Sequence, residues 1–159
     1  MKAKVYLETS VVSYRAARRA RDLIIAARQE ITHSRWPRIR RDFDCYVSAL
    51  VVQEAKGGDT QAAAARIAVI AGLSVLQISE DAESLAESLV ADGPISKNKL
   101  EDALHIALAA CNGIDYLLTW NFTHIHNAQM EVAIRRIVEQ QGYQCPVICS
   151  PDELIGEEE

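Results

Sequence analysis

The sequence contains no long apolar segment. No stretch approaches the ~20 consecutive apolar residues of a membrane-spanning helix, and the N-terminus, MKAKVYLETS, has too short an apolar run for a signal peptide. We therefore expect a soluble, cytoplasmic protein with no membrane partner. With 159 residues, 49% of them hydrophobic and 25% charged, the chain has the size and composition of one globular domain, which we place at residues 1–159.

The four cysteines show no CxxC spacing. Cys145 and Cys149 lie four residues apart and would share one face of a strand, but no further ligands cluster near them to complete a zinc site. We interpret the cysteines as small buried hydrophobic residues.

Several motifs of catalysis and nucleotide binding are also missing. The sequence has no GxxxxGK[ST], GxGxxG, GxSxG or HExxH. His124 and His126 lie two apart in a predicted loop, without the third ligand that a metal site needs. A phosphatase-like enzyme of this fold class is expected to carry a DxD motif after the first strand, and LETSV lacks it.

Charge is distributed unevenly along the chain. The net charge is −5, yet more than half of the 17 Lys and Arg residues lie in one arginine-rich segment (arginines 15, 18, 19, 21, 28, 35, 38, 40 and 41). Arginine pairs bidentately with phosphate, so this segment indicates a polyanionic partner. A solvated helix face and a site for an acidic protein segment remain open as alternatives.

Residue periodicity predicts strands alternating with helices. Short apolar runs predict strands at residues 4–7, 46–47, 74–78, 116–120 and 147–149. Helical spacing and capping residues predict helices at residues 19–31, 49–55, 60–72, 81–90, 99–111 and 128–141. Pro37 is expected to end or kink the helical region after residue 31 near Trp36. Such alternation is typical of an α/β protein with a parallel sheet covered by helices on both faces.

Acidic and amide side chains stand where strands end. Glu8 closes the first strand, Asn121 closes the fourth, and Glu54 lies in the last turn of the helix after the second strand. In open parallel sheets, sites form outside the carboxyl ends of the strands. These residues are therefore candidates for one site.

Asp102 is the most informative carboxylate. Its helix, LEDALHIALAAC, has almost no polar face and is expected to be largely buried. A carboxylate there must be paired or must bind a cation, because burying it alone is very costly. His105, three residues on, is an alternative partner that would make a salt bridge with Asp102.

Four segments together resemble a PIN domain: YLETS, VVQEA, EDALHIALAA and TWN-x-x-HI-x-N. More narrowly, they resemble the VapC-type toxins of toxin–antitoxin pairs, over nearly the whole chain and in the right order. The resemblance implies a PIN-like three-layer α/β/α fold with a five-stranded parallel sheet. It also implies a Mg²⁺- or Mn²⁺-dependent endoribonuclease.

The resemblance also assigns the candidate site. The four acidic positions of the family fall on Glu8, Glu54, Asp102 and Asn121, of which the three carboxylates would hold the metal. Supporting positions fall on Thr9 or Ser10, His124 and Asn127, with His105 beside Asp102.

Two residues depart from the family pattern. Glu8 replaces the usual Asp and carries one methylene more, enough to move a ligand oxygen by over ~1 Å against a tolerance of ~0.5 Å in a preorganised site. Asn121 replaces an acid and brings no charge. Three carboxylates suffice for one Mg²⁺, and we expect weakened cleavage. A PIN scaffold that binds RNA or a protein without cleaving is the alternative.

The expected partners are an RNA substrate, a cognate antitoxin and a second copy of the chain. Arg38, Arg40 and Arg41 are predicted to hold RNA phosphates near the rim of the acidic site. The antitoxin is expected to cover the same site.

Overall fold

The sheet at the centre of the protein has five parallel strands. The computed structural model describes residues 1–157, so Glu158 and Glu159 of the acidic C-terminus lie outside it. The strands are β1 (Lys4–Leu7), β2 (Asp44–Ser48), β3 (Ser74–Leu76), β4 (Tyr116–Leu118) and β5 (Val147–Cys149). They lie in the order β3-β2-β1-β4-β5, and every neighbouring pair is parallel. The predicted five-stranded parallel sheet is confirmed.

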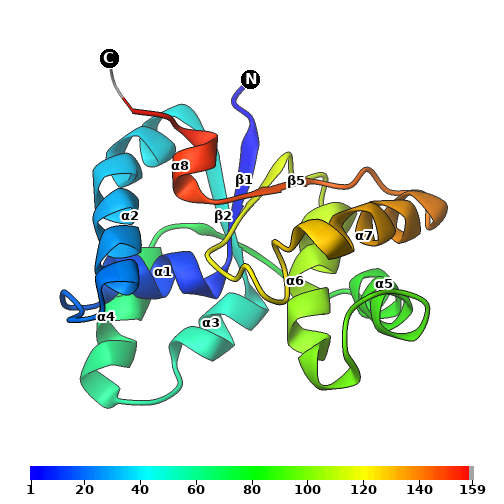
Figure 1. Ribbon diagram of the computed structural model, residues 1–159, viewed down its shortest axis with the longest axis horizontal. Helices are drawn as coiled ribbons and strands as arrows, with labels where there is room; N and C mark the ends of the chain where they lie inside the picture. The colour runs from blue at the N-terminus through cyan, green and yellow to red at the C-terminus, as the bar shows by residue number, and fades with distance from the viewer. Residues whose placement is uncertain (158–159) are drawn as a thin grey trace.

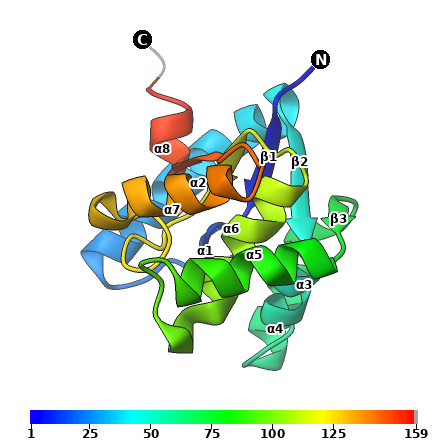
Figure 2. The same ribbon diagram turned by 90° about the vertical axis from the view of Figure 1, so that its right-hand side faces the viewer.

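Helices cover both faces of the sheet (Figures 1 and 2). One layer contains α1 (Thr9–Ala16), α2 (Leu23–Asp42), α3 (Ala49–Ala55), α4 (Thr60–Ile70) and the short α8 (Pro151–Leu154). The other contains α5 (Glu80–Ala91), the 3₁₀ turn η1 (Lys97–Lys99), α6 (Leu100–Cys111) and α7 (Ala128–Gln140). This arrangement confirms the three-layer α/β/α architecture.

The central strands are apolar because both of their faces are covered. Val5, Tyr6 and Leu7 of β1 and Leu117 and Leu118 of β4 are fully buried. The chain leaves β1 toward β2 on one side and reaches β4 on the other only after β3, so the order of the strands reverses between β1 and β4. Ligand sites of open α/β sheets form at such a switch point.

Side-chain caps set several of the helix boundaries. Ser48 and Asp59 cap α3 and α4 by accepting hydrogen bonds from Val51 N and Ala62 N, as the sequence predicted. The fourth strand is shorter than predicted because the Trp120 amide donates to Ser10 Oγ and so leaves the ladder.

Helix α2 differs from the prediction at both ends. It begins at Leu23, where Asp22 accepts from Ile25 N, because the preceding loop is held instead by Gln29, which bonds the backbone of Arg18 and Ala20. It then continues through Pro37 to Asp42, so the expected end near Trp36 is wrong.

Packing explains why α2 continues past the proline. Pro37 removes one helical hydrogen bond, but Ile39 beyond it is fully buried, and Arg35 before it donates to the carbonyl oxygen of Ile155 next to α8. These contacts hold the final turns in place.

The cysteines behave as predicted. All four are free thiols, three of them buried and Cys111 half-buried. Burial raises the pKa of Cys149 to about 12 and that of the other three above the usual thiol value, so the thiols stay protonated at neutral pH. Within residues 1–157, no helix is long and apolar enough to span a membrane.

Candidate functional site

The predicted site residues gather at the carboxyl edge of β1 and β4. Glu8 follows β1, and its amide donates to Leu118 O at the end of β4. Asn121 lies three residues beyond β4, Glu54 in the last turn of α3, and Asp102 in the first turn of α6. The strand-end rule therefore brings together side chains from four elements.

Glu8 is buried, with 6% of its surface exposed. It caps α1: its Oε2 accepts from Ser10 N at 3.1 Å, and its Oε1 accepts from the hydroxyls of Ser10 and, at 2.6 Å, Thr119. Both carboxylate oxygens are therefore already satisfied by protein donors.

Glu54 is held by two donors on one oxygen. Thr9 Oγ1 donates to its Oε1 at 2.6 Å, and His105 Nε2 lies 2.6 Å from the same atom. The other ring nitrogen of His105 is 2.7 Å from the Tyr6 hydroxyl, which lies 2.8 Å from Ser48 Oγ. A third of the Glu54 side chain remains exposed, whereas His105 is buried.

The ion pair sets the charges of both partners. Burial raises the pKa of Glu54, but the hydrogen bond and charge of His105 outweigh it, so the net pKa is lowered. Burial lowers the pKa of His105, but the Glu54 hydrogen bond and the charges of Glu8, Glu54 and Asp102 raise it overall. The three carboxylates thus all act on one buried imidazole.

The salt bridge considered between His105 and Asp102 is not present. The i, i+3 spacing puts both residues on one side of α6, but His105 is directed into the core toward β1 and α3, where Tyr6 and Glu54 take its two nitrogens. Asp102 is only partly buried, and its Oδ1 accepts from Asn121 Nδ2 at 3.3 Å. Burial, with the charge of Glu8, raises the Asp102 pKa against the opposing charges of His105, His124 and Lys99.

Asn121 organises the loop after β4. Its side-chain oxygen accepts from His124 N at 2.9 Å, and its backbone N–H donates to Thr119 Oγ1. The side-chain oxygen of Asn121 therefore bonds to the backbone of the loop.

Glu54 and Asp102 line the same pocket, which has a volume of about 680 Å³. Its lining is completed by Leu50, Gln53, Gly57, Ile78, Asn98, Lys99, Leu100, Glu101 and Leu104. Glu8 is not part of this lining. Within residues 1–157, no three His, Cys, Asp or Glu side chains are arranged to hold a metal ion together.

The arginines predicted to bind RNA lie elsewhere. Arg38 and Arg41 pair with Asp42 at the end of α2, at 4.0 and 2.8 Å. Arg40 lines a pocket with Lys2 and Asp44, at the amino ends of β1 and β2. The 20-residue α2 is about 30 Å long, so it carries these arginines away from the acidic edge, not to its rim.

Three site residues were missed from the sequence: Tyr6, Ser48 and Thr119. Each is a hydroxyl-bearing residue on or next to a strand, and each is fully buried. A buried hydroxyl needs a partner, so such residues at strand ends were the available signal.

A three-layer α/β/α domain with strand order β3-β2-β1-β4-β5 and acidic side chains at the switch point has the PIN-like fold of VapC-type toxins. The chain is similar to VapBC2 from Rickettsia felis, whose crystal structure was determined bound to a DNA fragment from their promoter (TM-score 0.59, 12% identity, 92% of this chain and 98% of that one). It is also similar to Mycobacterium tuberculosis VapC20, a sarcin–ricin loop cleaving toxin (TM-score 0.55, 18% identity, 75% and 91%). No family model and no curated protein sequence matches the chain.

Proposed function

We propose that this protein is a slow endoribonuclease of the PIN toxin type that depends on Mg²⁺ or Mn²⁺. One observation carries the proposal: Glu54 and Asp102, from two different helices, line one open pocket at the carboxyl edge of the sheet beside the switch point. Catalytic sites of open α/β folds lie there. The shared fold with toxins, one of them an RNA-cleaving toxin, supports RNA as the substrate.

The donor set fits one hard dication. Mg²⁺ takes oxygen ligands and is commonly bound through one or two carboxylates, several waters and substrate phosphates. Within residues 1–157, Glu54 and Asp102 each keep one carboxylate oxygen that accepts no hydrogen bond. The raised pKa of Asp102, caused by burial and by the charge of Glu8, marks negative charge that a cation would compensate.

Glu54, Asp102 and Glu8 have different parts in this chemistry. When bound, the ion would polarise a phosphate oxygen and lower the pKa of a water for attack. Glu54, ionised and fixed by His105 and Thr9, supplies negative charge in one place. Asp102, with its raised pKa, is the better proton acceptor of the two. Glu8 holds Ser10 and Thr119, and its role as a direct ligand stays a prediction.

A toxin-like ribonuclease needs an inhibitor, and we propose a cognate antitoxin that covers the pocket with a basic side chain. The exposed third of Glu54 and the partly exposed Asp102 give such a side chain two carboxylates to reach. A second copy of the chain is proposed as a further partner.

Cleavage of single-stranded RNA by the purified full chain tests the proposal. We expect cleavage that needs Mn²⁺ or Mg²⁺, stops on chelation, and falls roughly 100-fold or more in Asp102→Asn, because that change removes a charge from the reacting centre. Glu87→Gln, at an exposed position of α5, is the matched control and should cleave like the wild type. Equal cleavage by Asp102→Asn and the wild type would place the activity outside this pocket.

A non-cleaving PIN scaffold is the second candidate. The observation that favours it is that both carboxylate oxygens of Glu8 already accept hydrogen bonds from the protein. With both oxygens of Glu8 occupied, only Glu54 and Asp102 of the three predicted metal ligands remain available. The double variant Glu8→Asp with Asn121→Asp restores the family's residues. If neither this variant nor the wild type cleaves RNA with either metal, the scaffold reading replaces the enzymatic one.

A further inference from the structure

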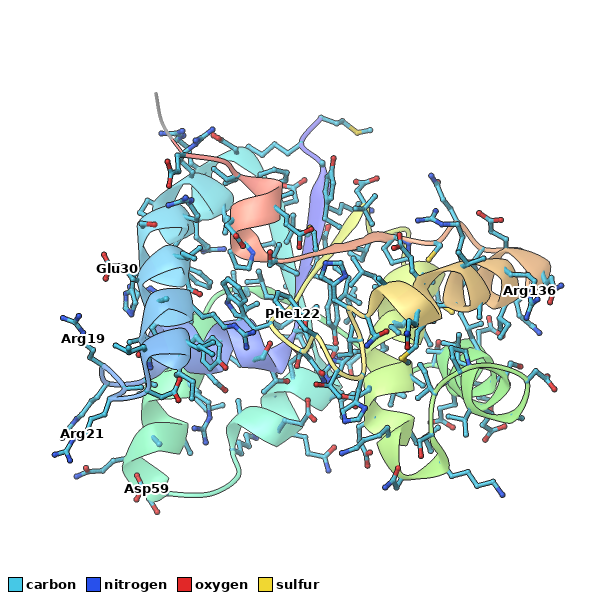
Figure 3. All side chains as sticks on the ribbon, in the orientation of Figure 1. Arg19, Arg21, Glu30, Asp59, Phe122 and Arg136 are labelled. Atoms are coloured by element: carbon cyan, nitrogen blue, oxygen red, sulfur yellow. The ribbon has the colours of Figure 1, made fainter. Side chains whose placement is uncertain are left out.

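An aromatic cluster borders the acidic site on the loop after β4. Phe122 directly follows Asn121 and is 38% exposed. It lies on the loop between β4 and α7 (Figure 3). Its ring centroid is 5.9 Å from that of Trp120 and 5.4 Å from that of His126. A large ring is thus held at the surface by other rings, beside the residue that contacts Asp102.

A guanidinium group lies over this cluster. The Arg28 guanidinium is 4.8 Å from the centroid of Phe122 and 5.6 Å from that of Trp120. The arrangement is braced from below, because Trp120 Nε1 donates to Thr32 Oγ1, which donates to the carbonyl oxygen of Arg28. Arg28 forms no ion pair within residues 1–157, so its charge is available to an anionic ligand.

A pocket opens beside Phe122. It has a volume of about 440 Å³ and is lined by Phe122, His126, Asn127, Ala128, Ser150, Asp152 and Glu153. The Glu153 carboxylate in this pocket is held in place by its hydrogen-bond partners. Its Oε1 accepts from Ser150 and lies 2.8 Å from His126 Nε2. The remaining oxygens of Asp152 and Glu153 are suited to N–H donors on the edge of a flat ring.

We propose that Phe122, Arg28 and this pocket form a subsite for one unstacked nucleobase of a single-stranded RNA. The proposal deepens the function proposed above and rests on it for the nature of the ligand. Sequence-selective proteins take single-stranded RNA by stacking splayed bases on aromatic rings and arginine planes, and the positive charge attracts the adjoining phosphate. Bases that carry an amino group are preferred over uracil, because the pocket offers carboxylate acceptors.

The position of the subsite favours RNA over a protein ligand. Phe122 adjoins Asn121, whose side chain contacts Asp102, so a base seated on Phe122 leaves its neighbouring phosphate next to the acidic pocket. A nucleotide has a flat π-surface next to a negative charge. The two rings with the Arg28 guanidinium over them match both of these features. This subsite replaces the distant Arg38, Arg40 and Arg41 as the nearest RNA contact.

RNA binding by the full chain tests the subsite without relying on cleavage. The probe is a fluorescein-labelled hexaribonucleotide, followed by anisotropy in an Asp102→Asn background that leaves it intact. We expect Phe122→Ala to weaken binding by roughly 5- to 100-fold and Phe122→Trp to restore it. Val132→Ala, which changes an apolar side chain that is 78% exposed on α7, should bind like the background.

Abasic probes identify the base. For the Asp102→Asn background, removing the base at one position of the RNA should weaken binding as much as Phe122→Ala weakens binding of the intact RNA. When Phe122→Ala is added to the background, removing that base should cause no further loss of affinity. Equal affinities of Phe122→Ala and Val132→Ala, additive losses at every position, or no RNA binding would each overturn the subsite. Phe122-dependent binding without any cleavage by the wild type would remove only the enzymatic proposal. Cleavage with Phe122-independent binding would remove only the subsite.

Discussion

A row of polar side chains crosses the core beneath the acidic pocket. It runs from Ser48 through Tyr6 and His105 to Glu54, where Thr9 donates to the same carboxylate oxygen. The polar atoms of Tyr6 and His105 have hydrogen-bond partners, which offset the cost of taking these side chains out of water. The row fixes the direction of Glu54, so a residue in the core controls a carboxylate at the surface.

The protonation of His105 should make stability depend on pH. Its folded-state pKa is raised above the ordinary 6.5, so its contribution is fully present below pH 6.5 and is lost as the pH rises through the folded-state pKa. We predict that the unfolding free energy of the wild type exceeds that of His105→Gln most at pH 5.5, and that the difference shrinks toward pH 8.5. Urea unfolding with a chelator present measures it.

The difference between the two proteins reports on His105 together with Asp102, whose raised pKa the charge of His105 opposes. The lowered pKa of Glu54 acts below 4.5, outside this range, and the thiols are common to both proteins. His33→Gln, at an exposed position of α2, is the control and should shift stability little. A difference that grows with pH would show that His105 is neutral in the folded protein.

Among the elements, the junction from α5 to α6 leaves no space for a side chain at Gly93. A Cβ on Gly93 would lie 2.5 Å from the carbonyl oxygen of Leu89 and 2.7 Å from Ile137 Cδ1 on α7. The backbone oxygen cannot move aside without disturbing the end of α5. We predict that Gly93→Ala lowers the unfolding free energy by about 1–3 kcal/mol, as overpacking does, measured by urea denaturation.

Gly156→Ala is the matched control, because no atom of residues 1–157 outside its chain neighbours lies within 4 Å of a Cβ at this position. It should unfold like the wild type. If Gly93→Ala proves as stable as this control, α5 and α7 are not packed as closely as these distances require.

Local patterns predicted most of the elements and half of the site. Strand ends and a buried helix placed Glu54 and Asp102 in one pocket, because the rule for parallel sheets depends only on the order of elements. The hydrogen bond from Thr119 to the Glu8 carboxylate was not predictable in this way, since Thr119 lies 111 residues further along the chain. Helical spacing offered a salt bridge with Asp102 as an alternative for His105, but packing against β1 decided its contacts.

The arginine segment illustrates the same limit. Proximity to Glu8 in the sequence suggested one surface, but the 20-residue helix α2 places its two ends about 30 Å apart. Only its geometry shows that Arg28 lies beside the aromatic loop and Arg40 beside the amino ends of the strands. Arg19 and Arg21, before the helix, point outward at a corner of the molecule (Figure 3).

At the scale of the whole molecule, charge is separated along the strand direction. The acidic pocket lies at the carboxyl edge of the sheet, and Arg38, Arg40 and Arg41 lie toward the amino edge. The expectation that the antitoxin covers the same surface on which these arginines hold RNA therefore changes. An antitoxin that covers the pocket need not cover those three arginines.

Binding of Mn²⁺ to the full chain, followed by the loss of the free-ion signal in electron paramagnetic resonance, tests whether the acidic pocket holds a metal. We expect about one bound Mn²⁺ per chain at the Glu54 and Asp102 pocket. Binding should be lost in Asp102→Asn and in Glu54→Gln, and retained in Glu87→Gln. There is no metal site in this pocket if the wild type leaves the free Mn²⁺ signal unchanged, or if Asp102→Asn lowers that signal as much as the wild type does.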